Sequence, residues 1–352
     1  MPTINLDLLK RLCETPGISG REDKIRDVVV AEMRALVDEL RVDTMGNVIG
    51  TKRGDGGPRV MIAAHMDEIG FFVRHVDDKG FLRLQPVGGF DPRVLVAQRV
   101  TVHGYDGNAY RGVVQPAAKP IHLLDPNEIK LPKLDELFVD VGLPVEQVRA
   151  GIEVGDMVTL ERALESSGDS VVSKALDDRV GLFVMIEALR AITGHTCEIL
   201  AVATTQEEVG LRGARTAAFA LEPDIAVALD VTLAGDIPGG KPELAVSELR
   251  GGVALKVMDS SHLTHPKLLR HLRDVADANG IPYQLELLPR GGTDAGAMQL
   301  SREGTAAITL SIPCRYVHTV NEMANLGDID ATIQLLARFL EDAGSRTYGY
   351  EV

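Results

Sequence analysis

Acidic and histidine side chains stand at the ends of several apolar runs, where they could hold metal ions or move protons. Two adjacent carboxylates, Glu207 and Glu208, follow the run 197–203. Neighbouring carboxylates repel each other, so the pair suggests a divided role, with one acid for a cation and one for a proton. The pair also fits a solvated helix start, because acidic residues favour the first turn of a helix.

Four further polar clusters occupy similar positions: His65-Met66-Asp67, Asp177-Asp178, Asp230 and His318. Each cluster by itself is a weak indication of a functional site, because an Asp at a strand end usually caps the next element. Taken together, two histidines and several carboxylates supply the nitrogen and hard oxygen ligands that suit Zn²⁺, Co²⁺ or Mn²⁺. In an extended segment residues i and i+2 point the same way, so Asp67 can accept a hydrogen bond from the distal imidazole N–H of His65.

The elements that must position these side chains follow an α/β pattern. Short runs rich in β-branched and small apolar residues predict buried strands at 59–64, 197–205, 224–229, 253–258 and 306–312. Helical spacing of apolar residues predicts helices at 6–14, from a capping box at 19–22 to about 40, and at 178–191, 212–219, 265–278 and 329–340. Open α/β sheets bind ligands beyond the carboxyl ends of their strands, so we expect the polar clusters to meet at one edge of the sheet.

The stretch 71–166 has a different texture, with short β-like runs between Asp-Gly and Asp-Lys-Gly turns and hardly any long helical periodicity. It predicts a small β-barrel or sandwich inserted into the α/β domain. We therefore expect a discontinuous catalytic domain formed by 1–70 and 167–352, with 71–166 as the insert. A chain of 352 residues is long for one domain, which agrees with this division.

Composition excludes several classes of protein. Hydrophobic residues at 45% and charged residues at 25% are typical of a globular protein with a sizeable core. The net charge of −14 argues against nucleic-acid binding, which needs clustered Lys and Arg. No apolar run is long enough to span a membrane, and the first residues do not form an export signal. Three widely separated cysteines suggest neither disulfides nor a metal knuckle, so we expect a reducing, cytoplasmic location.

Seven motifs occur in order along nearly the whole chain: Ala-His-Met-Asp-Glu-Ile-Gly, Val-Gly-Gly-Phe-Asp-Pro-Arg, Lys-Ala-Leu-Asp-Asp-Arg, Gln-Glu-Glu-Val-Gly, Leu-Asp-Val-Thr, Gly-Gly-Thr-Asp-Ala-Gly and Tyr-Val-His-Thr. Through them the chain resembles the di-metal aminopeptidases that form tetrahedral shells, a family of glutamyl, leucyl and lysyl aminopeptidases that are also misnamed as endoglucanases. The resemblance implies a zinc-peptidase-like α/β domain with a mixed sheet, and an inserted β-barrel that serves dimerisation. Such dimers assemble into dodecamers.

The resemblance also implies a role for each matching residue. Asp177 would bridge two metal ions, His65 and Asp230 would complete one site, and Glu208 and His318 would complete the other. Glu207 would be the general base, and Asp67 would support His65. A cis peptide between Asp177 and Asp178 is expected as well. The implied cofactors are two divalent ions, with Zn²⁺ preferred and Co²⁺ or Mn²⁺ as alternatives.

The glycine-rich segment 290–296 is a poor phosphate cradle, because it lacks both a Walker Lys-Ser/Thr and the register of a dinucleotide site. It suits a tight loop that lines a substrate pocket, in which Asp294 either caps the following helix or binds substrate.

The sequence therefore predicts a metal-dependent aminopeptidase that removes N-terminal residues from short peptides. A related di-metal amidohydrolase, such as a dipeptidase, carboxypeptidase or deacylase, would share the ligand set. A glycosidase would use paired carboxylates without metal. A non-catalytic assembly scaffold would keep the fold and bind no metal.

Overall fold

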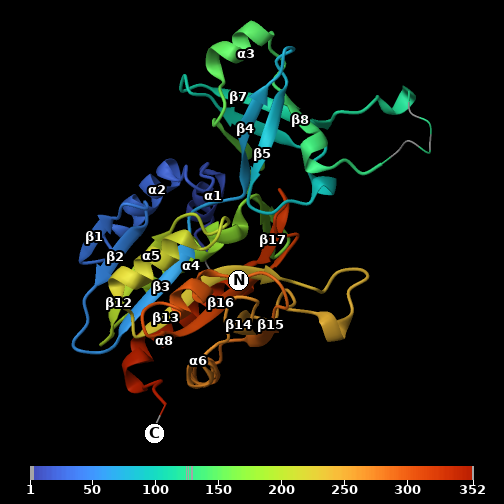
Figure 1. Ribbon diagram of the computed structural model, residues 1–352. Coiled ribbons are helices and arrows are strands. Elements are labelled where there is room, and N and C mark those ends of the chain that lie inside the picture. Colours follow the sequence, from blue (N-terminus) through green and yellow to red (C-terminus); the bar gives the residue numbers. More distant parts are fainter. Residues whose placement is uncertain (1–3, 124, 126, 128–129, 351–352) are drawn as a thin grey trace.

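The computed structural model describes residues 4–350 apart from 124, 126 and 128–129. The chain forms a layered α/β domain, and a small β-barrel projects from it (Figure 1). The chain leaves the layered domain after Arg59–His65 (β3) and returns to it at Glu165–Ser167 (β10). This arrangement confirms the predicted mixed α/β fold with an inserted barrel.

The large sheet has eleven strands among the described residues. Besides β3 and β10 they are Glu39–Val42 (β1), Val48–Lys52 (β2), Ser170–Ser173 (β11), Glu198–Thr204 (β12), Ile225–Leu233 (β13), Val253–Met258 (β14), Tyr283–Leu287 (β15), Ala306–Arg315 (β16) and Glu322–Asn325 (β17). Their order is β1-β2-β12-β3-β13-β16-β17-β11-β10, and β14 pairs with both β15 and β16. The central strands β12, β3, β13 and β16 are parallel, so their carboxyl ends lie at one edge.

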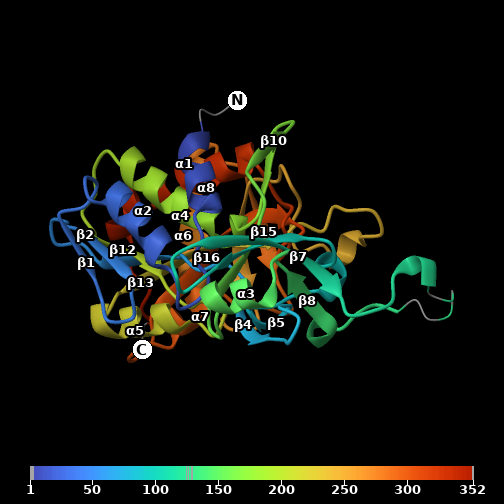
Figure 2. The ribbon, with the colours of Figure 1, turned by 90° about the horizontal axis from the view of Figure 1, so that it is seen from above.

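Helices cover both faces of this sheet. They are Leu6–Glu14 (α1), Asp23–Met33 (α2), Leu176–Ala191 (α4), Arg212–Leu221 (α5), Pro266–Asn279 (α6), Asp294–Gln299 (α7) and Leu326–Asp342 (α8). Side chains alternate along β3, so that Val60 and Ile62 pack with α1, α2, α4, α6 and α8, whereas Met61 and Ala63 pack with α5 and α7. Figure 2 shows α1, α2 and α8 on one side of the strands, with α5 and α7 on the other. Burial on both faces explains why these strands are continuous apolar runs.

The inserted segment closes into an antiparallel barrel. Its strands are Gly70–Val76 (β4), Leu82–Val87 (β5), Arg99–His103 (β6), Ala109–Pro116 (β7), Leu137–Asp140 (β8) and Met157–Leu160 (β9), in the closed order β4-β5-β8-β7-β6-β9. A helix, Val145–Gly151 (α3), packs against it, and the barrel has its own apolar core. Closure leaves the barrel without a free sheet edge.

One predicted element is wrong near the N-terminus. The helix expected from the capping box to about residue 40 ends at Met33, and Leu40 lies in β1. Apolar side chains at 36, 37 and 40 reach the core from either conformation. Antiparallel pairing of β1 with β2, as in Leu40 opposite Gly50, satisfies the backbone there instead. The capping box itself does not form, because Glu22 is the N-cap of α2 and no side chain bonds to the helix start.

Among the described residues, no helix combines the length and the apolar character that a membrane crossing requires.

Candidate metal centre

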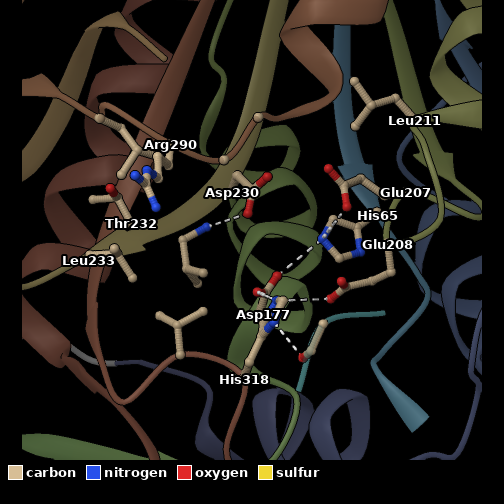
Figure 3. Close-up of a pocket in the computed structure, with 16 residues that line it drawn as sticks. His65, Asp177, Glu207, Glu208, Leu211, Asp230, Thr232, Leu233, Arg290 and His318 are labelled. Atoms are coloured by element: carbon tan, nitrogen blue, oxygen red, sulfur yellow. Dashed lines mark hydrogen bonds and ion pairs between the residues drawn. The ribbon is translucent and has the colours of Figure 1, made fainter. Parts of the chain in front are cut away.

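Five side chains of metal-ligand type come together in two groups that share Asp177. One group contains His65, Asp177 and Asp230, and the other contains Asp177, Glu208 and His318. Within each group, one ligand atom from each residue lies within 4.8 Å of the others. No other such group occurs within the described part of the chain. Figure 3 shows Asp177 between the two histidines.

The two oxygen atoms of Asp177 face different histidines. His65 Nε2 lies 3.1 Å from Asp177 Oδ1, and His318 Nε2 lies 3.3 Å from Asp177 Oδ2. His318 Nε2 is also 3.4 Å from Glu208 Oε1. A carboxylate placed in this way can bind one cation through each oxygen.

The fold explains why residues so far apart in sequence meet here. His65 ends β3, Asp230 lies on the adjacent parallel strand β13, and Glu208 follows the end of β12. Asp177 stands in the irregular first turn of α4, where the expected cis peptide to Asp178 is present. His318 lies between β16 and β17. The carboxyl edge of the central strands therefore gathers the whole group.

Backbone carbonyls orient both imidazole rings. His65 Nδ1 is 2.9 Å from the carbonyl oxygen of Asp67, and His318 Nδ1 is 2.9 Å from the carbonyl oxygen of Gly89. When each Nδ1–H donates to its carbonyl, the lone pair on Nε2 is directed at the carboxylates. Gly89 belongs to the inserted segment, so the insert helps to orient a ligand of the centre.

The Asp67 carboxylate has a different set of partners from the predicted one. Its Oδ1 lies 3.6 Å from His65 Nδ1, farther than the carbonyl oxygen of the same residue. The carboxylate instead accepts the backbone N–H groups of Glu207 at 3.0 Å and Glu208 at 3.2 Å. Asp67 thus supports His65 through its main chain and the Glu207–Glu208 loop through its side chain.

The electrostatics of the site favour bound cations. Burial raises the pKa of Glu207 and of Asp230 well above the ordinary carboxyl value, and neighbouring carboxylates add to the effect. Burial lowers the pKa of His318, but contacts with Asp177 and Glu208 outweigh it and raise this pKa to about 12. When no cation is bound, the repulsion among the carboxylates is reduced only if the carboxyl groups or the imidazole rings take up protons.

The donor set fits divalent metal ions. Each group offers one imidazole nitrogen together with carboxylate oxygens, which suits Zn²⁺, Co²⁺ and Mn²⁺. Glu208 Oε1 is buried and accepts no hydrogen bond from the described residues. His318 Nε2 lies 3.4 Å from it, and a cation that binds this buried oxygen would satisfy it more fully, which agrees with a role as metal ligand.

A cavity of about 550 Å³ opens at the metal groups. Arg290, Gly291 and Gly292 line it, as expected for the glycine-rich loop. The predicted helix cap by Asp294 is wrong, whereas its role in substrate binding stays a prediction. Its Oδ2 accepts the Thr204 hydroxyl at 2.5 Å, it makes no cap bond to α7, and it is not among the lining residues.

The chain matches the family model described as M42 glutamyl aminopeptidase over residues 46–335. It is 40% identical to a lysyl aminopeptidase from Pyrococcus furiosus, over 96% of this chain and 97% of that protein. The chain belongs to the M42 peptidase family. It is accordingly an aminopeptidase, a hydrolase.

Solved structures agree with this membership. An aminopeptidase from the archaeon Desulfurococcus kamchatkensis superposes with a TM-score of 0.92 at 43% identity, covering 96% of this chain and 94% of that one. The Pyrococcus horikoshii TET1 peptidase, described as assembling into a tetrahedron or a large octahedral shell, has a TM-score of 0.84 at 30% identity over 95% of this chain and 98% of that chain. These similarities confirm the predicted family.

Sequence reasoning missed several residues that support the centre of this M42 peptidase. Glu322 accepts the backbone N–H of Asp177 at 3.0 Å and that of His318 at 2.8 Å, so one carboxylate fixes two proposed ligands. Asp178 accepts the N–H of His65 at 3.1 Å. Asp178 adjoins a predicted ligand and could have been suspected, whereas nothing around Glu322 distinguishes it from a surface acid.

Replacing Glu322 with Ala should weaken metal binding, because the backbone at Asp177 and His318 loses its shared acceptor. We expect the Kd for Zn²⁺ to rise about 10- to 100-fold, as for other residues that orient metal ligands. Calorimetric titration of chelator-treated protein measures the Kd. Glu303→Ala changes an exposed acid and is the matched control. A Kd within twofold of wild type in Glu322→Ala would contradict the assigned role.

Proposed function

We propose that this M42 peptidase removes N-terminal residues from short peptides at a two-metal centre, with Glu207 as general base. The observation that carries the proposal is the pair of ligand groups that share Asp177. The proposed ligands are His65, Asp177, Glu208, Asp230 and His318. Zn²⁺ is the proposed native metal, with Co²⁺ and Mn²⁺ as functional replacements.

Two divalent ions, when bound, supply the Lewis acidity that lowers the pKa of water and stabilises negative charge on the attacked carbonyl oxygen. Glu207 lies beside the ligands, with its Oε2 3.9 Å from His65 Nε2, but belongs to neither ligand group. Its raised pKa suits a group that takes a proton from water and then gives it to the leaving amine. Asp67 holds the backbone of this base through the bond to the Glu207 N–H.

The cavity supports a substrate that is the end of a short peptide. Its wall contains apolar side chains from Leu211, Leu233 and Leu288 together with the cation of Arg290. Figure 3 places Arg290 beside Thr232 and across the cavity from Leu211. One peptide end can therefore meet the metal centre while its first side chain contacts this wall.

We also propose that the chain forms a homo-oligomer through the inserted barrel, with the domain limits 71–166 for the insert. The barrel stands away from the layered domain (Figure 1). Its loop carries exposed apolar side chains, including Leu123 and Leu131 at 69% and 71% exposure. Apolar groups that are this exposed favour burial against a second copy. A dodecamer built from such dimers is supported by a solved relative that is described as a dodecamer and by shell formation of the Pyrococcus horikoshii relative.

Metal removal and a base substitution test the proposed chemistry. Chelation should abolish release of the N-terminal residue from aminoacyl anilides, and Zn²⁺, Co²⁺ or Mn²⁺ should restore it. Glu207→Gln should lower kcat about 10²- to 10⁴-fold, because the amide cannot take a proton from water. Elemental analysis should find both metals still bound to this variant. Unchanged turnover in chelator, or in a fully loaded Glu207→Gln variant, would refute the mechanism.

Arg290→Glu should shift selectivity toward basic N-terminal residues, because it reverses the charge on the cavity wall. Arg290 is exposed and lines the cavity, so its positive charge lies on the cavity wall. We expect the ratio of kcat/KM for lysyl over glutamyl anilide to rise about tenfold or more. The leucyl anilide serves as the neutral control. A ratio that changes less than twofold would place Arg290 away from the bound side chain.

The assembly is tested by light scattering during gel filtration. The chain has a mass of 37.9 kDa, and we expect a species of twelve chains in equilibrium with dimers. A monomer at micromolar concentration would refute the proposed oligomer.

A further inference from the structure

The loop after β12 carries Glu207 and Glu208, and its backbone N–H groups are held by side chains from elsewhere, whereas several of its carbonyl groups accept N–H groups of the next turn. Residues 205–208 lie outside any helix or strand. Each of their four N–H groups donates to a side-chain oxygen far away in sequence. The acceptors are Asn47 Oδ1 for Thr205 at 3.0 Å, Glu22 Oε1 for Gln206 at 3.2 Å, and the two Asp67 oxygens for Glu207 and Glu208 at 3.0 and 3.2 Å.

Two of the side chains in this network come from the segment before α2. Glu22 is 2% exposed, and its Oε1 also accepts the N–H of Gly20 at 2.8 Å. Ser19 is 5% exposed, and its hydroxyl donates to Asp67 Oδ2 at 2.6 Å. These residues have the spacing of a capping box, yet neither bonds to the start of α2. Their polar atoms are directed at the loop and at Asp67.

The loop needs such support because its geometry is unfavourable. Gln206 has a φ of 55°, a left-handed conformation that residues other than glycine rarely adopt. This residue turns the chain immediately before Glu207 and Glu208. The Glu22 carboxylate accepts the N–H of that same residue, so it stabilises the turn that points both acids at the centre.

We propose that Ser19 and Glu22 are positioning residues for hydrolysis, which hold the Glu207–Glu208 loop in the conformation that the reaction requires. This inference rests on the proposed roles of Glu207 as base and Glu208 as metal ligand. Glu22 acts directly on the loop backbone. Ser19 acts through Asp67 by fixing one of the two oxygens that bind the loop.

Glu22 offers a cleaner test than the other two acceptors. Asn47 also bonds to Asp43 and to the carbonyl oxygen of Gly213, so its loss disturbs a wider region. Asp67 adjoins His65 as well as the loop. Among the described residues, the side-chain hydrogen bonds of Glu22 join its own segment to the loop.

The decisive comparison is Glu22→Ala against Glu22→Gln. Alanine removes the acceptor for the Gln206 N–H, whereas glutamine keeps an oxygen at the same position. With saturating Zn²⁺ and aminoacyl anilide, we expect Glu22→Ala to lower kcat about 10- to 100-fold while KM changes less than threefold. Glu22→Gln should return kcat to within about fivefold of wild type. Lys24→Ala, an exposed change in the first turn of α2, is the control and should match wild type.

Zn²⁺ titration provides a readout that does not depend on activity. The Glu22→Ala substitution would displace Glu208. We therefore expect the variant to bind one of two Zn²⁺ ions about tenfold more weakly, with its affinity for the other ion unchanged. Ser19→Ala should lower kcat about three- to tenfold, and its effect should be smaller in the Glu22→Ala background because both act on one loop.

These outcomes separate the two proposals. If wild type released no N-terminal residue with any metal, the proposed function would fail, and the Zn²⁺ titration would still decide the role of Glu22. A folded Glu22→Ala variant with kcat and both Zn²⁺ affinities within twofold of wild type would overturn this inference. A Glu22→Ala variant with a lowered Tm but unchanged kcat and Zn²⁺ affinities would also overturn this inference. If Glu22→Ala does not fold, Ser19→Ala decides by the same criteria.

Discussion

Buried like charges at one point of the fold are the constraint on which the site depends. Asp177, Asp230, Glu207 and Glu208 all lie within one small region and are largely removed from water. Ionised carboxylates repel one another strongly in such surroundings. Burial raises the pKa of Asp230, Glu207 and Glu208, whereas for Asp177 the contacts with His318 and His65 outweigh burial and lower the pKa. Cations placed among the four carboxylates would let all of them remain charged, and the shared position of Asp177 would allow two such cations. The surrounding structure is consistent with this requirement, since both histidines present Nε2 to Asp177, one at each of its oxygens.

Hydrogen bonds hold the backbone around the site in place against that repulsion. The parallel strands end at one edge of the sheet. The loops that follow them carry backbone N–H groups for which neither a helix nor the sheet provides an acceptor. Carboxylates outside the ligand groups fill this need. Glu322 accepts N–H groups from the backbone of two proposed ligands, and Asp67 and Glu22 accept those of the loop at 206–208. Such acceptors add negative charge to a region already rich in it, which the bound cations would offset.

The inserted segment forms the barrel and also contributes to the candidate site in the layered domain. Its chain passes the centre at Gly89, where a carbonyl oxygen orients His318. A side chain at this position would meet the imidazole, since an added Cβ would lie 3.3 Å from His318 Nδ1. Movement of this segment relative to the layered domain would therefore reach His318, a proposed metal ligand. In an oligomer held together by the barrel, assembly and the geometry of the centre would be coupled.

The sequence by itself determined the class of fold, the insert and the identity of the chemical groups. Apolar runs such as 197–203, short and rich in β-branched residues, are typical of strands buried on both faces, and the ordered motifs indicated which polar residues belong together. Tertiary structure alone decided the partners of the backbone around those residues. Ser19 and Glu22 have the local pattern of a helix cap, yet the Ser19 hydroxyl donates to Asp67 and the Glu22 carboxylate accepts the N–H of Gln206, in a loop far along the chain. The sequence around Glu322 contains no motif that predicts a functional role. Hydrogen bonds to a remote backbone depend on which segments the fold brings together, and a local sequence pattern carries no record of that.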